Sequence, residues 1–350
     1  MHRFFHPTSS VRIFAASSLI SIIVLGAVLL GFGWQAALVA LMLVIIELTF
    51  SFDNAIINAR ILTTMSPFWQ KMFMTVGILI AVFGMRVIFP ILIVMFSAGL
   101  GWSEVIGLAL HQPDRYAEVL HTAHPAIAAF GGMFLLMLTL HFFFEARDVQ
   151  WLGRIEQPLQ YVGRKWLHAV VCSIILLTIT LLPINYHPEQ IFLAGLVGIA
   201  TYLIIHGAAE LFTAQHARAE KKAGKALQKA GVAGFISFLY LEVLDASFSF
   251  DGVIGAFAIT KDVVLIAAGL GIGALWVRSL TLFIVHKKVL HTYRYLEHGA
   301  HYVIGILAIT LLLGIFYEIP EMIAGLLGIG IIIAAVTSSI KQGDSEVAVK

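Results

Sequence analysis

Charged residues and cysteine are scarce in this chain of 350 residues. Asp, Glu, Lys and Arg together make up 12% of it, while hydrophobic residues make up 60%. A water-soluble domain of this length carries about twice that charged fraction. The single cysteine, Cys172, excludes an internal disulfide and any metal site built from several thiolates.

The sequence contains no H-E-x-x-H and no G-x-S-x-G motif, so nothing in it predicts a zinc protease or a serine hydrolase. We therefore expect neither a soluble domain nor an enzyme.

Long apolar runs are what the sequence has instead. A helix needs about 20 apolar residues to cross the hydrocarbon core of a membrane. Runs of this kind, bounded by charge or by Pro and Gly, predict an all-α polytopic transmembrane bundle that forms a single domain over residues 1–350. The predicted spans are 11–32, 35–58, 71–98, 126–145, 168–184, 191–213, 232–259, 263–285, 300–317 and 322–340.

The placement of positive charge predicts how the spans are oriented. With the N-terminus in the cytoplasm, nearly all of the 22 Lys and Arg residues fall on the cytoplasmic side. Arg115 and Lys261 fall outside, and Arg86 and Arg278 lie within spans. Cytoplasmic loops of membrane proteins carry an excess of Lys and Arg. We therefore expect an integral protein of a bacterial inner membrane with both termini in the cytoplasm.

Two segments in different halves of the chain read almost alike. ELTFSFDN at Glu47–Asn54 matches DASFSFDG at Asp245–Gly252, which aligns two acidic residues and two copies of FSFD. Further along, GILIAVFGMR at Gly77–Arg86 matches GLGIGALWVR at Gly269–Arg278. The matching segments are five predicted spans apart, and this odd offset makes the two copies face opposite ways. Inverted repeats with a site at their interface are typical of secondary transporters. We predict one repeat over residues 11–184 and the other over residues 191–340.

Polar side chains recur on one face of each motif helix. At steps of three or four residues they form a polar stripe of Glu47, Ser51, Asn54 and Asn58 in the first motif and of Glu242, Asp245 and Ser249, with Gly252 on the same face, in the second. Asp53 and Asp251 lie six residues beyond the aligned acids, so in a continuous helix they point away from that face. They join the same site only if each helix unwinds, which Asn54 and Gly252 tolerate. We therefore predict broken helices at both motifs.

The chemistry of these side chains favours a hard divalent cation. An ionised group at the centre of a span costs at least ~2.5–3.5 kcal/mol, so each acid needs a partner. Carboxylate, hydroxyl and amide oxygens suit Mg²⁺, Ca²⁺ or Mn²⁺. Crowded carboxylates also leave room for coupled protonation. Arg86 and Arg278 balance the charge or gate the path. The alternative is a purely structural lock, in which Asp53 pairs with Arg86 and Asp251 with Arg278.

Two further pairs have the pattern H-x-x-x-E. They are His141 with Glu145 and His206 with Glu210, and each pair lies on one helix face. This pattern is compatible with a secondary metal site, with a proton relay, and with an ordinary hydrogen-bonded pair between helices.

The paired acidic motifs resemble those of TerC-like integral membrane proteins, within the LysE-type transporter superfamily, and in particular a larger, formerly uncharacterised branch. The resemblance rests on E-x-x-F-S-F-D-N and E-V-L-D-A-S-F-S-F-D-G and covers roughly residues 35–320, with the in-span arginines included. It implies manganese efflux, with the metal carried by the positions that match Glu47, Asp53, Asp245 and Asp251.

Taken together, these observations predict a secondary transporter that exports a divalent cation by alternating access, with Mn²⁺ favoured and with proton coupling as an option. The cation is the substrate, and we expect no tightly bound cofactor. We expect the lipid bilayer to surround the chain, and we expect no nucleic-acid partner. Two alternatives stay open: transport of Ca²⁺ or Mg²⁺, and a non-transporting membrane component of a tellurite-resistance or envelope-stress complex. The sequence does not indicate protein partners.

Overall fold

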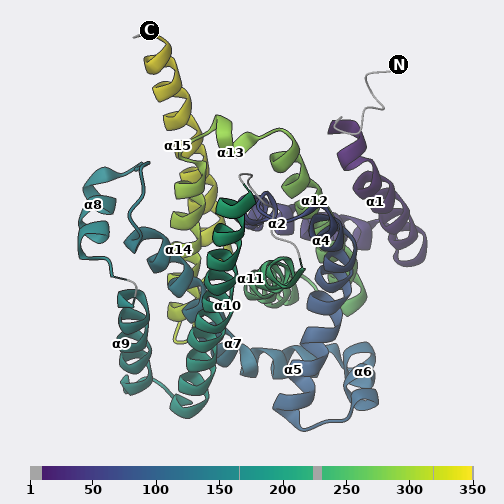
Figure 1. Ribbon diagram of the computed structural model, residues 1–350. Helices are drawn as coiled ribbons and strands as arrows, with labels where there is room; N and C mark the ends of the chain where they lie inside the picture. The colour runs from purple at the N-terminus through teal and green to yellow at the C-terminus, as the bar shows by residue number, and fades with distance from the viewer. Residues whose placement is uncertain (1–9, 165, 224–230, 318, 349–350) are drawn as a thin grey trace. The chain divides into compact units, whose positions relative to one another are not determined.

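The described part of the chain is all-α, as predicted, and contains no strand. A computed structural model describes residues 10–164, 166–223, 231–317 and 319–348, except the side chains of residues 10–12, 50, 97, 211–223, 250–251, 258, 291, 321–322 and 343–348. The helices (Figure 1) are α1 (Ser10–Phe32), α2 (Trp34–Phe50), α3 (Phe52–Leu62), α4 (Pro67–Leu79), the π-helix η1 (Ile80–Ile88), α5 (Phe89–Ala98), α6 (Trp102–His111), α7 (Pro113–Phe144), α8 (Gly153–Val162), α9 (Leu167–Leu181), α10 (Pro188–Ala223), α11 (Gly231–Ile259), α12 (Val263–His286), α13 (Val289–Thr292), α14 (Leu296–Gly314) and α15 (Glu321–Ala348).

The helices reproduce the predicted pattern of membrane spans. Among the described residues, eight helices are long and apolar enough to cross a membrane, and the number rises to ten if each of two bent helix pairs is one span. The bent pairs are α2 with α3, at 52°, and α8 with α9, at 98°. Helices prevail because a segment in hydrocarbon has to satisfy its backbone N–H and C=O groups internally. The helix content and the apolar lengths define a polytopic integral membrane protein.

A single glycine separates the first two long helices. α1 ends at Phe32 and α2 begins at Trp34, and Gly33 between them has φ 89° and ψ 174°. This region of backbone conformation is essentially restricted to glycine, because a Cβ would clash there. The turn therefore falls at the sequence GFGW, where the predicted spans change.

The helix break predicted at the first acidic motif is confirmed. Ser51 lies between α2 and α3 with φ −99° and ψ 16°, in the sparsely populated bridge region. The backbone hydrogen bonds continue through it: Ser51 N–H donates to Glu47 O at 3.0 Å, and Ala55 N–H donates to Ser51 O at 3.2 Å. The chain therefore bends here while it keeps the local backbone groups satisfied.

The break predicted at the second acidic motif is wrong. α11 runs from Gly231 to Ile259 without interruption. Gly252 permits a bend but does not require one. An unbroken helix keeps all of its backbone hydrogen bonds, which matters inside a membrane because no water is present to replace them. A Cβ at Gly252 would lie 3.2 Å from Glu47 Oε2. This glycine therefore provides room for an acidic side chain and not a hinge.

The chain forms two compact units, and neither is a contiguous half of the sequence. The first unit comprises Met1–Thr63, Pro67–His124 and Leu241–Lys287, and the second comprises Thr64–Ser66, Pro125–Tyr240 and Lys288–Lys350. Each unit therefore combines helices from both predicted repeats. The inverted orientation of those repeats stays a prediction.

Small residues let helices approach closely within each unit. In the first unit, α12 packs against α2 through two glycines one turn apart. A Cβ at Gly269 would lie 2.5 Å from Leu43 Cβ and 2.9 Å from Ala40 O, and a Cβ at Gly273 would lie 2.5 Å from Glu47 Cβ. In the second unit, α14 and α15 run beside each other (Figure 1). Close backbone approach of this kind is how small residues stabilise helix pairs in membranes.

We expect Gly269→Ala to lower the free energy of unfolding by about 1–3 kcal/mol, as overpacking of a filled interface does. The new methyl group would meet the backbone of α2, which has no room to move. Thermal unfolding of the purified protein in detergent measures the effect. Gly26→Ala is the matched control, because nothing lies within 4 Å of a Cβ there. Equal stability of the two variants would contradict the close α2–α12 contact.

Candidate functional site

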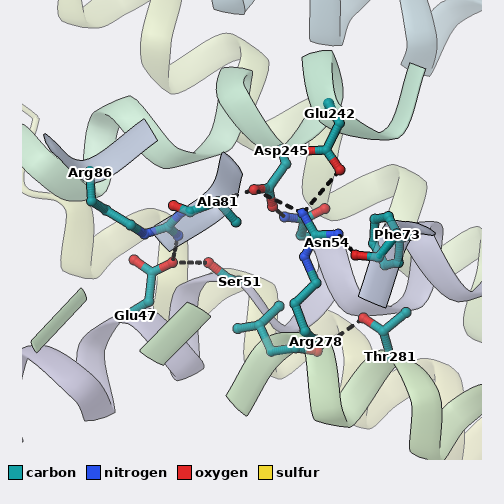
Figure 2. A network of polar contacts seen from close by, with 11 residues as sticks. Glu47, Ser51, Asn54, Phe73, Ala81, Arg86, Glu242, Asp245, Arg278 and Thr281 are labelled. Atoms are coloured by element: carbon teal, nitrogen blue, oxygen red, sulfur yellow. Dashed lines mark hydrogen bonds and ion pairs between the residues drawn. The ribbon is translucent and has the colours of Figure 1, made fainter. Parts of the chain in front are cut away.

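Three of the acids predicted from sequence meet both in-span arginines in the first unit. They come from α2, η1, α11 and α12, and their side chains point toward one another (Figure 2). We call this group the acid–arginine network: Glu47, Arg86, Glu242, Asp245 and Arg278. All five side chains are buried. The network therefore places several ionisable groups where water does not reach them.

Glu47 and Arg86 form one end of the network. Arg86 Nη2 donates to Glu47 Oε1, and Ser51 Oγ donates to the same oxygen at 3.2 Å. Arg86 Nη1 also donates to Ala81 O at 2.6 Å, five residues back along η1. Ser51 lies one turn after Glu47, so its hydroxyl reaches the ion pair, and the bend between α2 and α3 begins at this same residue.

Asp245 is the centre of the network, because both arginines approach it. Its Oδ2 lies 3.9 Å from Arg86 Nη1 and 3.6 Å from Arg278 Nη2. Its other oxygen accepts a hydrogen bond of 2.8 Å from Asn54 Nδ2. One carboxylate from α11 thus links η1, α12 and α3 (Figure 2).

Arg278 and Glu242 form the other end. Arg278 Nη2 lies 3.4 Å from Glu242 Oε1, and Arg278 Nη1 donates to Phe73 O at 3.3 Å. The guanidinium also stands 3.7 Å over the Phe73 ring, in a cation–π contact. A Cβ at Gly77 would lie 2.6 Å from Glu242 Oε1 and 2.8 Å from Arg278 Nη1, so this glycine leaves room for the pair.

Buried carboxylates outnumber buried guanidinium groups among the side chains of this unit that the structure describes. The buried carboxylates there are Glu47, Asp53, Glu242 and Asp245, and the buried guanidinium groups are Arg86 and Arg278. When every group is ionised, two negative charges are left over. Asp53 lies in the first turn of α3, directly after the bend, and forms no ion pair with another described residue. The structural lock of Asp53 with Arg86 is therefore wrong, because Arg86 pairs with Glu47 and Asp245.

Several buried oxygen atoms around the network have no hydrogen-bond partner among the described residues. They are Asp53 Oδ2, Asn54 Oδ1, Asn58 Oδ1, Glu242 Oε2 and Asp245 Oδ2. Asn58 lies one turn beyond Asn54 on α3 and is fully buried. Buried polar atoms are nearly always paired, so an unpaired group calls for an ion, a water molecule or a functional reason. Sequence reasoning placed Asn58 on the polar stripe but not among the site residues.

The buried acids of the acid–arginine network face arginines and do not form a preformed metal site. Among the described residues, no three His, Cys, Asp or Glu side chains are placed so that they could hold one metal ion. Ser249 is buried on α11, where its position in the site stays a prediction. The side chain of Asp251 lies outside the described part of α11, so its pairing with Arg278 and its part in a metal site remain predictions.

The predicted histidine–glutamate pairs lie in the second unit. His141 on α7 and His206 on α10 are brought together, with ring centroids 4.2 Å apart, and His206 Nε2 lies 3.7 Å from Glu210 Oε1. Glu145 pairs with Arg147 at 2.9 Å. His168 on α9 also joins this group, and sequence reasoning missed it. Its only signal was a histidine at the start of an apolar run.

The fold and the buried ionic site define an all-α, polytopic integral membrane protein. A family model described as "Protein of unknown function (DUF475)" matches residues 52–346, and the chain belongs to this family. No curated protein and no solved structure matches the chain.

Replacement of Arg278 by Met should lower the free energy of unfolding by about 3–5 kcal/mol, because it leaves the buried Glu242 without a cation and leaves Asp245 with Arg86 alone of its two arginines. Adding Glu242→Gln to Arg278→Met should recover part of the loss, since one unpaired charge is removed as well. Thermal and denaturant unfolding in detergent measure both changes.

Arg115→Met is the matched control, because Arg115 is an exposed arginine on α7. If Arg278→Met were no less stable than Arg115→Met, the ion pairs of Arg278 would not stabilise the first unit.

Proposed function

We propose that this protein is a secondary transporter that exports a divalent cation, with Mn²⁺ as the first candidate, by alternating access. The observation that carries the proposal is the excess of buried carboxylates over buried guanidinium groups among the described side chains of the first unit. An uncompensated charge inside a membrane protein is costly, so such groups mark an ion path or a binding site. A divalent cation would balance the excess.

In this proposal the arginines stand in for the cation when it is absent. The guanidinium groups of Arg86 and Arg278 occupy the centre of the network, each beside the carboxylate of Asp245. A dication that reaches the same carboxylates competes with them, and the arginines then move aside. The unpaired oxygens of Asp53, Asn54 and Asn58 are further hard ligands. Ligand exchange of this kind couples metal binding to a rearrangement of η1 and α12.

The choice of Mn²⁺ rests on the resemblance to TerC-like proteins, and Ca²⁺ and Mg²⁺ are alternatives with the same oxygen ligands. Proton coupling is part of the proposal, because crowded carboxylates exchange protons when a metal leaves. For the location we propose a bacterial inner membrane with both termini in the cytoplasm, which the asymmetry of Lys and Arg along the sequence supports.

One observation favours a second candidate function. Glu47, Glu242 and Asp245 are already paired with arginines, and no described group of three ligand side chains could hold a metal ion. A closed ionic lock of this kind suits a non-transporting membrane component of a resistance or stress complex. The two candidates differ in one measurable property, namely metal flux across a sealed membrane.

Purified protein in sealed vesicles should carry Mn²⁺ down its gradient, and Asp53→Asn should reduce this flux by about 10–100-fold, the usual cost of changing a group next to a metal. Asp53 is the substitution of choice because it is buried without an ion-pair partner, so its loss breaks no described salt bridge. A metal-sensitive dye inside the vesicles records the flux, and a panel of Mn²⁺, Ca²⁺ and Mg²⁺ ranks the substrates.

Glu118→Gln removes the charge of an exposed acid on α7 and is the matched control. In cells, Asp53→Asn should raise the manganese content and abolish rescue of a manganese-sensitive strain. Absence of flux for all three metals with well-folded wild-type protein would overturn the transport proposal and favour the membrane component.

A further inference from the structure

Three histidines from three helices meet in the second unit, and we call them the histidine cluster: His141 on α7, His168 on α9 and His206 on α10. The ring centroid of His141 lies 4.2 Å from that of His206 and 4.8 Å from that of His168. His141 is therefore the middle ring of a row of three. Neighbours in the row are close enough for hydrogen bonding through small side-chain rotations.

The histidine cluster runs from an exposed acid to a buried ring. Glu210 is the outer member, with a side chain 57% exposed, and its Oε1 lies 3.7 Å from His206 Nε2. The side chain of His206 is 29% exposed, whereas His168 at the other end is only 5% exposed. Glu210, at the end of a candidate membrane span, is therefore open to the surroundings of the protein, whereas His168 is enclosed by it.

Aromatic side chains close the inner side of the histidine cluster. Tyr202 lies one turn before His206 on α10 and stacks on it, with centroids 5.3 Å apart and planes 6° from parallel. Tyr202 is fully buried, and Phe134 of α7 packs on its far side at 5.7 Å. Parallel stacking fixes the orientation of the His206 imidazole through its face. The ring nitrogens lie at the edge of the ring, so stacking does not obstruct hydrogen bonds to them.

The titratable groups that face the histidine cluster come from the helices packed against it and from the residue that follows α7. They are Glu145 directly after α7, Cys172 on α9, Tyr202 and Glu210 on α10, and Tyr240 on α11, all of which interact electrostatically within this group. Glu145 is partly neutralised by Arg147. His298 and His301 of α14 instead pack on Phe142 of α7, with ring centroids 5.2 Å and 3.6 Å away.

Imidazole is the side chain that changes charge near neutral pH, and it can both accept and donate a proton. Two neighbouring imidazolium ions repel each other, so rings in contact favour one shared proton over several. Imidazoles also bind transition metals, but no three described ligand side chains are placed to hold a metal ion. The arrangement thus fits a proton better than a metal.

We propose that the histidine cluster is a proton-binding relay, in which a proton enters from water through Glu210 and passes by way of His206 and His141 to the buried His168. Glu210 takes the proton from water as a carboxylic acid and returns to its carboxylate form when it passes the proton to His206 Nε2. His206 and His141 each gain the proton at one ring nitrogen and return to the neutral ring when they pass it on, and His168 holds it as an imidazolium, so no other reactant is needed. Sequence patterns suggested two separate pairs, whereas the structure joins them through the contact of His141 with His206 and adds His168 at the end of the row.

The proton-binding property does not depend on transport and can be tested alone. Magnetic resonance of isotope-labelled histidine in the full-length protein follows each ring between about pH 5 and pH 8, where imidazole changes charge. In a relay the three rings titrate together, and His168→Gln shifts the titration of His141 and His206 by about one pH unit or more, as expected for interacting sites.

His206→Gln is the second variant, because a partly exposed residue is less important for folding than the buried His168. It should shift the titration of His141 and His168 in the same way. His286→Gln, at the exposed end of α12, is the control and should shift none of the three. Independent titration of the remaining rings in both cluster variants would overturn the relay, and so would a metal ion found bound to the three rings.

The role of the relay as the coupling site rests on the proposed function. With a pH gradient across the vesicle membrane, wild-type protein should accumulate Mn²⁺ at least about tenfold for each pH unit, the ratio for one coupled proton. His168→Gln and His206→Gln should lose this accumulation but keep downhill exchange of Mn²⁺. Full accumulation in both variants would overturn the coupling role. Absence of exchange of Mn²⁺, Ca²⁺ and Mg²⁺ in the wild type would overturn the proposed function and this coupling role, and the titration would still decide proton binding.

Discussion

Burial of two arginine side chains is the constraint on which the first unit depends. Arg278 is 2% exposed and Arg86 is 4% exposed, so neither guanidinium can be stabilised by water. Arg86 is stabilised by the carboxylate of Glu47 and the backbone carbonyl of Ala81. Arg278 is stabilised by the carboxylate of Glu242 and by the backbone carbonyl and the ring of Phe73. Breaking one of these ion pairs would leave the remaining charged group buried and unpaired, at the full cost of its desolvation. The ion pairs therefore hold α2, η1, α11 and α12 together.

Glycines around the network give space to charged groups. Gly77 leaves room for Glu242 and Arg278, whereas Gly252 and Gly273 leave room for Glu47. Gly77 and Gly269 occupy matching places in the two similar segments, and each marks a close approach to a helix of the other half. The sequence similarity is thus reflected in packing. The same small residues that bring helices together in lipid also decide which side chains fit between them.

Much of the fold could be predicted from the sequence, because apolar length and the position of Gly33 are local properties. The bend at Ser51 followed from helical phase, and the meeting of Glu47, Asp245 and the arginines followed from their cost in an apolar medium. The rest depends on tertiary contacts. Neighbouring helices determine that α11 is unbroken, that Arg86 pairs with Glu47 and not with Asp53, and that His168 lies beside His141. Contacts between helices leave no pattern in the local sequence from which they could be predicted. The π-helical geometry of η1 likewise has no simple signal.

The irregular turns of η1 have a consequence for the two similar halves. Arg86 is presented by a π-helix, whereas its counterpart Arg278 is presented by the regular helix α12. The bend at Ser51 also has no equivalent in α11. Both departures from regular geometry therefore occur in the same half of the chain. Two halves of similar sequence thus adopt unequal conformations, and an interchange of these conformations would produce a second state of the protein, related to the first by the predicted internal symmetry.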